Sequence, residues 1–293
     1  MNKTCTNHTC PYFQTDHMIQ KDGRFYRASD SRWIQRFRCR HCRKRFSAAS
    51  FSDEYRLQNR RITQDIKRYL VSGVSQRRVA LLLKVSRVTV AKRFVLLKNR
   101  ARSSQLVYLE QLKNMPIKKV QFDDLITTEH TKLKPLTVSI AVDPSSRAIL
   151  GAKVGRIPAF GPLAKKSREK YGWRASEHRK TLSALFNEIK LSVDAKAEFR
   201  SDEHSLYPQV LLKYFKEASH HTFKGGRACI AGQGELKKVG RDPLFYINHT
   251  CAMLRANINR LIRKTWCTTK TPEQLQWHLD LFIDYYNREY LKL

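Results

Sequence analysis

The sequence is short of acidic residues and has no long hydrophobic run. It contains 25 Asp and Glu against 57 Lys and Arg, which gives a formal net charge of +32 and an isoelectric point near 10.2. This excess of positive charge predicts a polyanionic partner bound through its phosphates, and nucleic acid is the expected one. No apolar run approaches the roughly 18 residues of a membrane span, and residues 1–10 lack the apolar core of a signal peptide. We therefore expect no membrane partner and a cytoplasmic, nucleoid-associated protein, or a nuclear one where the host has a nucleus.

Cysteine is also scarce, but four of the seven cysteines form two close pairs. Cys5 and Cys10 make a C-x4-C pair, and Cys39 and Cys42 a C-x2-C pair. Such pairs favour metal ligation in a reducing compartment over disulfides. Four thiolates suit a tetrahedral structural zinc ion, which leaves no position open for catalysis. His8 or His41 in place of one sulfur is the alternative.

Residues 1–51 are therefore predicted to form a small zinc ribbon that needs its metal to fold. Some of the cations from Arg36 to Arg45 balance the negative zinc–thiolate group, and the rest are placed to meet phosphate. The aromatic and apolar residues between the two cysteine pairs are expected to pack the ribbon: Phe25, Tyr26, Trp33, Ile34 and Phe37.

Residues 52–104 have the pattern of an all-α DNA-binding domain. Apolar spacing predicts a first helix over 61–72, and Ser75 is placed to cap a second. A short connection leads to Ser86, which is placed to cap a third helix over 87–100. Two helices joined so closely favour a helix-turn-helix, with a plain basic helical linker as the alternative.

The third helix is expected to read DNA from its N-terminal part, because a recognition helix contacts base edges there. Val90, Phe94 and Leu97 would form its buried stripe. The side chains then left on the exposed early face, and expected to meet the major groove, are Arg87, Thr89, Lys92 and Arg93.

Residues 107–293 change to strands and later helices, so the fold class predicted for this domain is α/β with a mixed five-stranded sheet. With 293 residues and 41% hydrophobic content, the chain is long enough for two or three such modules. The strands expected are 120–126, 136–142, 148–154 and a short one at 197–199. The helices expected are 176–192, 206–217, 247–264 and a last one opened by Thr271 and Pro272, which read as a cap and a first-turn proline.

Two acidic residues follow strand-like runs in this basic chain. In Val120-Gln-Phe122-Asp123-Asp124, the period-two alternation of a strand turns Asp123 away from the core face that Val120 and Phe122 share. Asp124 would lie on the Phe122 side and serve structure, and Asp202 ends the fourth strand. Two carboxylates in positive surroundings suit metal-assisted phosphodiester chemistry. The plain alternative for each Asp is an ordinary strand-end residue.

The order of modules resembles the bacterial insertion-sequence transposases of the DDE superfamily, whose catalytic domain is RNase H-like. The resemblance rests on Arg38-Cys-Arg-His-Cys-Arg-Lys-Arg-Phe-Ser47, on the helix-turn-helix pattern and on the basic segment from Leu254 to Lys270. It implies Mg-dependent cleavage and transfer of DNA strands, with Mg²⁺ or Mn²⁺ held by Asp123 and Asp202. It also implies double-stranded DNA partners, namely terminal inverted repeats and target DNA, and a homo-oligomer on that DNA.

The sequence departs from the family where a third carboxylate is expected, because Asn248 stands at that place. Three explanations compete: a variant that uses Asn248 or His249, a ligand recruited from Glu203 or Glu129, or a catalytically inactive descendant. The last would be a sequence-specific, regulatory DNA-binding protein. An RNA-binding protein would explain the charge but not the helix-turn-helix. The basic residues of the final segment that are expected to contact DNA are Arg255, which would share a helix face with Asn248, and Arg260 and Arg263.

Overall fold

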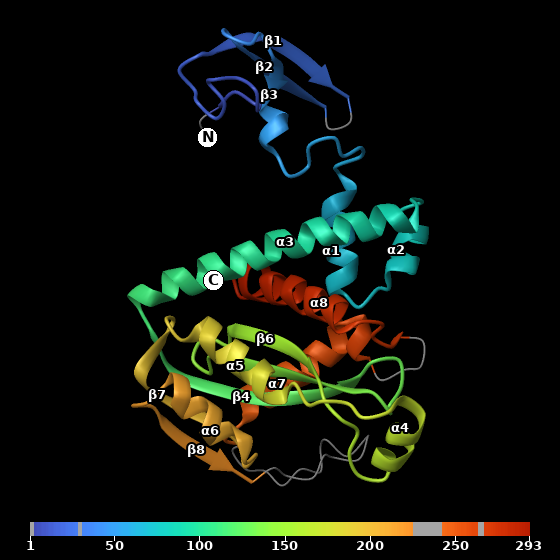
Figure 1. Cartoon of the computed structure of the whole chain (residues 1–293), viewed down its shortest axis with the longest axis vertical. Helices are drawn as coiled ribbons and strands as arrows, with labels where there is room; N and C mark the ends of the chain where they lie inside the picture. The colour runs from blue at the N-terminus through green and yellow to red at the C-terminus, as the bar shows by residue number, and fades with distance from the viewer. Residues whose placement is uncertain (1–2, 29–30, 225–241, 263–266) are drawn as a thin grey trace. The chain divides into compact units, whose positions relative to one another are not determined.

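The computed structural model describes residues 3–28, 31–224, 242–262 and 267–293 (Figure 1). The chain forms two compact units, Met1–Asp65 and Ile66–Leu293. In the described parts of both units, no helix has the length and apolar character that crossing a membrane requires. Arg263, which the sequence predicts to contact DNA, lies outside the described residues.

The first unit contains a small antiparallel sheet, as the sequence predicts. Its strands are β1 (Ile19–Arg27), β2 (Arg32–Cys39) and β3 (Arg45–Ser47), in that order, followed by a 3₁₀ turn at Ala48–Phe51. Phe37 and Phe46 lie opposite each other on β2 and β3, and both are buried.

Two aromatic residues of this sheet do not pack it. Tyr26 and Trp33 are 52% and 67% exposed, so the prediction that they contribute to the core is wrong. They lie opposite each other near the turn of the β1–β2 hairpin, at the end away from Phe37 and Cys39. The few residues of the unit bury only the cysteine end of the hairpin, and the far end extends past this core.

The second unit begins with three helices whose start signals are local. Ser75 caps α2 (Gln76–Leu82) and Ser86 caps α3 (Arg87–Gln111), each by accepting a hydrogen bond from a backbone N–H of the first turn. Both predicted caps are confirmed. α1 (Ile62–Val71) precedes them. α3 is longer than expected and runs through the predicted boundary near residue 104.

The five-stranded sheet is mixed, as predicted. Its order is β6-β5-β4-β7-β8, with antiparallel β4–β5 and β5–β6 pairs and parallel β4–β7 and β7–β8 pairs. The sequence did not predict β8. The strands are β4 (Ile117–Thr128), β5 (Pro135–Val142), β6 (Ile149–Arg156), β7 (Val193–Asp202) and β8 (Ser219–Phe223).

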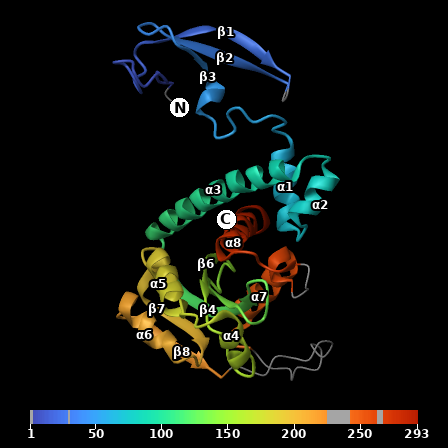
Figure 2. The same ribbon diagram turned by 45° about the vertical axis from the view of Figure 1, so that its right-hand side comes forward.

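Helices cover both faces of this sheet. Figure 2 shows α5 (His178–Ile189) and α6 (Leu206–Tyr214) on one side and α7 (Phe245–Asn257) on the other. A Cβ on Gly155 of β6 would lie 2.0 Å from Thr181 Oγ1, so the glycine permits the close approach of α5. α4 (Leu163–Tyr171) lies in the chain between β6 and α5.

The edge strand β6 is covered by the C-terminal helix α8 (Pro272–Asp284), which continues as a π-helical turn over Tyr285–Tyr290. Gln276 accepts a hydrogen bond from Val154 N and donates one to Ala152 O. Asn287 bonds both backbone groups of Ile149. These side chains satisfy polar groups that an open edge would leave exposed to other strands.

Candidate metal centre and carboxylate site

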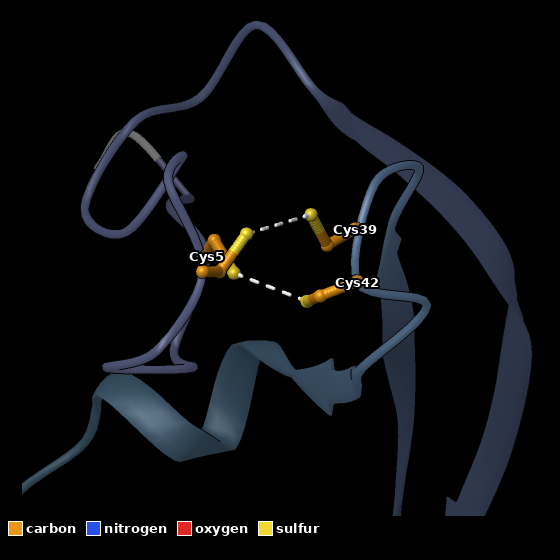
Figure 3. A group of neighbouring side chains, drawn as sticks. Cys5, Cys39 and Cys42 are labelled. Atoms are coloured by element: carbon orange, nitrogen blue, oxygen red, sulfur yellow. Dashed lines mark hydrogen bonds between the residues drawn. The ribbon is translucent and has the colours of Figure 1, made fainter.

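The four N-terminal cysteines come together at one end of the first unit. All four sulfur atoms lie within 4.8 Å of one another, with Cys5 and Cys42 3.6 Å apart and Cys10 and Cys39 4.0 Å apart. Figure 3 shows Cys5, Cys39 and Cys42 pointing toward one another. Four sulfurs at about 2.3 Å from a tetrahedral zinc ion would be separated by about 3.8 Å, so this cluster fits a structural zinc ion.

The second cysteine pair sits on a tight turn that begins at Cys39. Arg43 N donates to Cys39 O at 2.9 Å, and the positive φ of Arg43 (56°) closes the turn. Backbone hydrogen bonding at Lys44 lowers the pKa of the Cys42 thiol to about 7, whereas burial raises the pKa of Cys5 to about 12. A cation is therefore needed to ionise all four thiols together. His41 Nδ1 lies 3.7 Å from the sulfur of Cys10, beside the cluster and outside the four-sulfur set.

The second candidate site is set by the register of two parallel strands. Gln121 of β4 lies opposite Arg200 of β7. Two residues further along each strand, Asp123 and Asp202 occupy corresponding positions and share one face of the sheet, because side chains alternate with a period of two. Two carboxylates far apart in the sequence are thereby brought together.

Asp123 is held in an environment that opposes its charge. Burial raises its pKa to about 7, and the negative charges of Asp202 and Asp124 act in the same direction. Its carboxylate accepts hydrogen bonds from Asp124 N at 2.7 Å and from the Tyr207 hydroxyl at 3.4 Å. Neither acid of the pair forms an ion pair with a cation of the described chain.

Asp124 faces the opposite side of the sheet and is fully hydrogen-bonded. It accepts hydrogen bonds from Thr137 at 2.8 Å, from Ser139 at 2.5 Å and from the Tyr207 hydroxyl at 2.7 Å, and it contacts His178 Nε2. Burial would raise the pKa of Asp124, but these partners, with His178 first, hold it below its usual value. The prediction that Asp124 serves structure agrees with these contacts.

Helix α7 is fixed on the Asp123 face by one side chain of β4. Gln121 accepts a hydrogen bond from Ile247 N at 3.1 Å and donates one to Pro243 O at 2.9 Å. Burial raises the pKa of the Cys251 thiol to about 12; the Asp123 charge adds to this and Arg255 opposes it. Cys251 thus lies on the side of α7 within electrostatic reach of Asp123, and Arg255, one turn further along α7, lies within reach of Cys251.

The residues considered as replacements for the missing third carboxylate lie at different places in the fold. Asn248 and His249 are exposed in the first turns of α7, and Asn248 Nδ2 donates to Asp242 Oδ2 at 2.9 Å. Asp242 was not considered from the sequence, because only the fold brings it beside Asn248. Glu203 is exposed next to Asp202.

Glu129 is a poor candidate ligand. It lies about 20 Å along the chain from Asp123, six extended residues at ~3.3 Å each. Its carboxylate is paired with Arg174 at 3.0 Å and with Arg156 at 4.0 Å. In the residues that the structure describes, the cysteine cluster is the one group of three or more His, Cys, Asp or Glu side chains close enough to share a metal ion.

The expected DNA-reading face of α3 is present except for one residue. Arg87 and Lys92 are exposed, and Thr89 is half-buried, with its hydroxyl 2.9 Å from the Ser86 hydroxyl of the cap. Arg93 is only 3% exposed, so the prediction that it reaches a groove is wrong. It directly precedes Phe94, and α3 packs against α8 along this side.

Two basic residues near the end of α7 are also described. Arg255 is half-buried in the last turn. Arg260 follows the helix and is half-buried, donates to Gln274 Oε1 at 3.0 Å, and has its pKa lowered by burial.

Compared with known proteins, the chain matches no family model and no curated protein.

Proposed function

We propose that this protein is a transposase of the DDE type, which binds the ends of a mobile element and cuts and joins DNA strands with a divalent metal ion. The observation that carries the proposal is the β4–β7 register. It sets Asp123 and Asp202 side by side on one face of the sheet, where Asp123 is half-buried, forms no ion pair among the described residues and has its pKa raised to about 7, first by burial. Groups whose pKa is shifted by burial together with a neighbouring charge cluster at functional sites.

The architecture supports an RNase H-like assignment. Three antiparallel strands, β4 to β6, are followed by α5, by the parallel strand β7 and by α6. This succession of elements resembles that of the catalytic domain of the DDE enzymes. Asp123 and Asp202 lie on β4 and β7, neighbouring inner strands of the sheet, where a catalytic pair is expected.

The donor set fits a hard divalent cation. Mg²⁺ and Mn²⁺ take oxygen ligands and keep several waters, so two carboxylates and one further oxygen are enough. Asp123 and Asp202 would hold the ion, with Asp242 or the amide oxygen of Asn248 as the further ligand. The metal supplies Lewis acidity that activates a water or a 3′-hydroxyl and stabilises the leaving oxygen. Arg255, on the same side of α7, is assigned to the scissile phosphate.

DNA recognition is assigned to the first three helices and to the cysteine unit. Helices α2 and α3 form the helix-turn-helix, and Arg87, Thr89 and Lys92 face the major groove from the start of α3. The net charge of +32 supplies the phosphate contacts. We assign the cysteine cluster a structural zinc ion in a ribbon that contacts the same DNA. Two element ends must meet for joining, so we expect a homo-oligomer.

A second candidate function is a regulatory DNA-binding protein that has lost cleavage. Asn248 at the place of the expected Glu favours it. So does the geometry of the described residues, in which no third His, Cys, Asp or Glu side chain forms a close group with Asp123 and Asp202, so Asp242 would have to move toward the pair to complete a metal site.

The deciding experiment uses the purified full-length protein and a duplex carrying the inverted repeat that flanks its coding region. With Mg²⁺ or Mn²⁺ the wild-type protein should nick the duplex at the repeat end. Asp123→Asn and Asp202→Asn preserve shape and should abolish nicking without weakening binding in a gel-shift assay. Asp194→Asn, on the same strand as Asp202 but at its other end, is the matched control and should nick normally.

The two functions give different results in this assay. Tight, repeat-specific binding with no nicking under either metal would select the regulator. Unchanged nicking in both substituted proteins would eliminate the carboxylate pair as the site of chemistry.

A further inference from the structure

The tip of the β1–β2 hairpin presents two aromatic rings to solvent. Trp33 is 67% exposed and Tyr26 is 52% exposed, although an isolated sheet gains stability by burying such side chains. The two residues are directly opposite in the ladder, so their side chains project from the same face. Neither ring belongs to the core at the cysteine end of the unit. The packing of that core therefore does not explain why the two rings are present.

The two rings are not stacked face to face, because their centroids are 5.6 Å apart and their planes are inclined at 60°. With Trp33 mostly exposed, much of its ring surface is open to solvent. A flat, uncharged ring can therefore lie on Trp33 with Tyr26 at its edge. Aromatic pairs that simply stabilise a strand pair would bury this area instead.

The surroundings of the pair are cationic. Residues 19–39 contain six Lys and Arg against two Asp, and Asp22 is paired with Arg45 at 2.8 Å. Arg27 and Arg32 lie directly opposite each other near the tip and add to this positive charge. Exposed Arg24 lies two residues before Tyr26 and so projects from the same face as the rings.

We propose that this hairpin tip binds single-stranded DNA, with Trp33 and Tyr26 as the stacking platform for unpaired bases and Arg24 and Arg32 on the flanking phosphates. Stacked aromatics and a basic track together are the general means of holding a single strand. A duplex offers the same phosphates, but its base faces are already stacked on one another. The positive charge likewise favours a polyanion over a second copy of this basic chain.

The test measures binding of the full-length zinc-loaded protein to three fluorescent probes at one salt concentration. The probes are a twelve-nucleotide oligothymidylate, an abasic strand of the same length and a random-sequence duplex. Trp33→Ala should weaken oligothymidylate binding by about fivefold or more, the equivalent of ~1 kcal/mol of base–aromatic stacking. Binding to the abasic strand and to the duplex should stay unchanged. Trp33→Phe should restore most of the loss.

Trp173→Ala is the matched control, because Trp173 is also beside an arginine and is 80% exposed, but lies in the second unit. It should leave all three affinities unchanged. Equal loss on the oligothymidylate and abasic strands would overturn the proposal, because the ring would then act on the fold or the backbone. No loss on any probe would overturn it too, as would a Trp33→Ala protein that changes only its oligomeric state. The site does not depend on the carboxylate chemistry, so Asp123→Asn should keep the preference for bases.

Discussion

Acid should weaken the second unit through one buried histidine. His278 of α8 is 5% exposed, and its ring centroid lies 4.4 Å from that of Phe94 on α3. Burial, aided by the positive charge of Arg260, lowers the pKa of His278 from 6.5 to about 3. The histidine is therefore neutral in the folded protein over the whole range in which a free histidine takes up a proton.

The direction and size of the effect follow from this difference. Above pH 6.5 neither state binds the proton and stability does not depend on it. Below pH 6.5 only the unfolded chain is protonated, so the folded state loses stability as the pH falls, until the folded pKa of about 3 is reached. At 1.36 kcal/mol for each pH unit, the loss at pH 5 is about 2 kcal/mol relative to pH 7.5.

Urea unfolding at pH 7.5 and pH 5.0 isolates this loss when wild type is compared with a His278 variant, because Asp123, whose pKa is raised to about 7, contributes with the opposite sign in both proteins. Far-UV circular dichroism follows the second unit, because α2 to α8 lie within it. His278→Phe keeps a ring against Phe94 and should remove about 2 kcal/mol of the pH dependence, whatever its constant effect on packing. His249→Gln replaces an exposed histidine and should leave the pH dependence as in the wild type. An equal pH dependence in His278→Phe and wild type would refute the reasoning.

Three further predictions concern the two sites. The wild-type protein should carry one zinc ion by native mass spectrometry. Cys39→Ala should lose it and unfold the first unit, because such sites contribute ~10 kcal/mol or more to folding, whereas Cys251→Ala should keep the metal. Tyr207→Phe removes a donor from buried Asp124, which should lower the free energy of unfolding by about 1–3 kcal/mol in urea and slow nicking; unchanged stability would contradict the hydrogen bond. Asp242→Asn should abolish metal-dependent nicking while gel-shift binding persists, whereas normal nicking would leave Asn248 as the further ligand.

Local signals in the sequence were enough for much of the fold. The caps Ser75, Ser86 and Thr271 were predicted because a side chain and a backbone N–H two or three residues later are sufficient to form them. In a capping box, the side chain of Gln274 would accept a hydrogen bond from the backbone N–H of Thr271. It accepts one from Arg260 instead, so a partner more distant in the sequence takes the place of the local one.

What escaped prediction depended on such distant partners. Burial of Arg93 follows from the packing of α3 on α8, which no pattern within α3 reports. β8 is short and mostly polar, and becomes a strand because β7 offers it a parallel edge. Tyr26 and Trp33 were assigned to a core on residue type alone. They are exposed because a unit of this size has too few residues to cover the whole hairpin.

The part of the candidate site that depends on the alternation of side chains along one strand was predicted. A period of two placed Asp123 and Asp124 on opposite faces, and the structure has them so. The position of Asp202 beside Asp123 required the β4–β7 pairing, and the position of α7 on the Asp123 face required its anchoring by Gln121.

The two neighbouring acids also show how the fold treats a structural carboxylate and a reactive one. Asp124 receives hydroxyl donors from β5 and α6 and a histidine from α5, which hold its pKa low and fix it as an anion. Asp123, one residue earlier, is half-buried but receives only one backbone N–H and a long contact from Tyr207. A carboxylate serving the core would be expected to have donors like those of Asp124, because an unmatched buried charge is destabilising. Asp123 lacks such donors, and burial together with the negative charge of Asp202 raises its pKa. A divalent cation bound beside it would stabilise its ionised form and offset this repulsion.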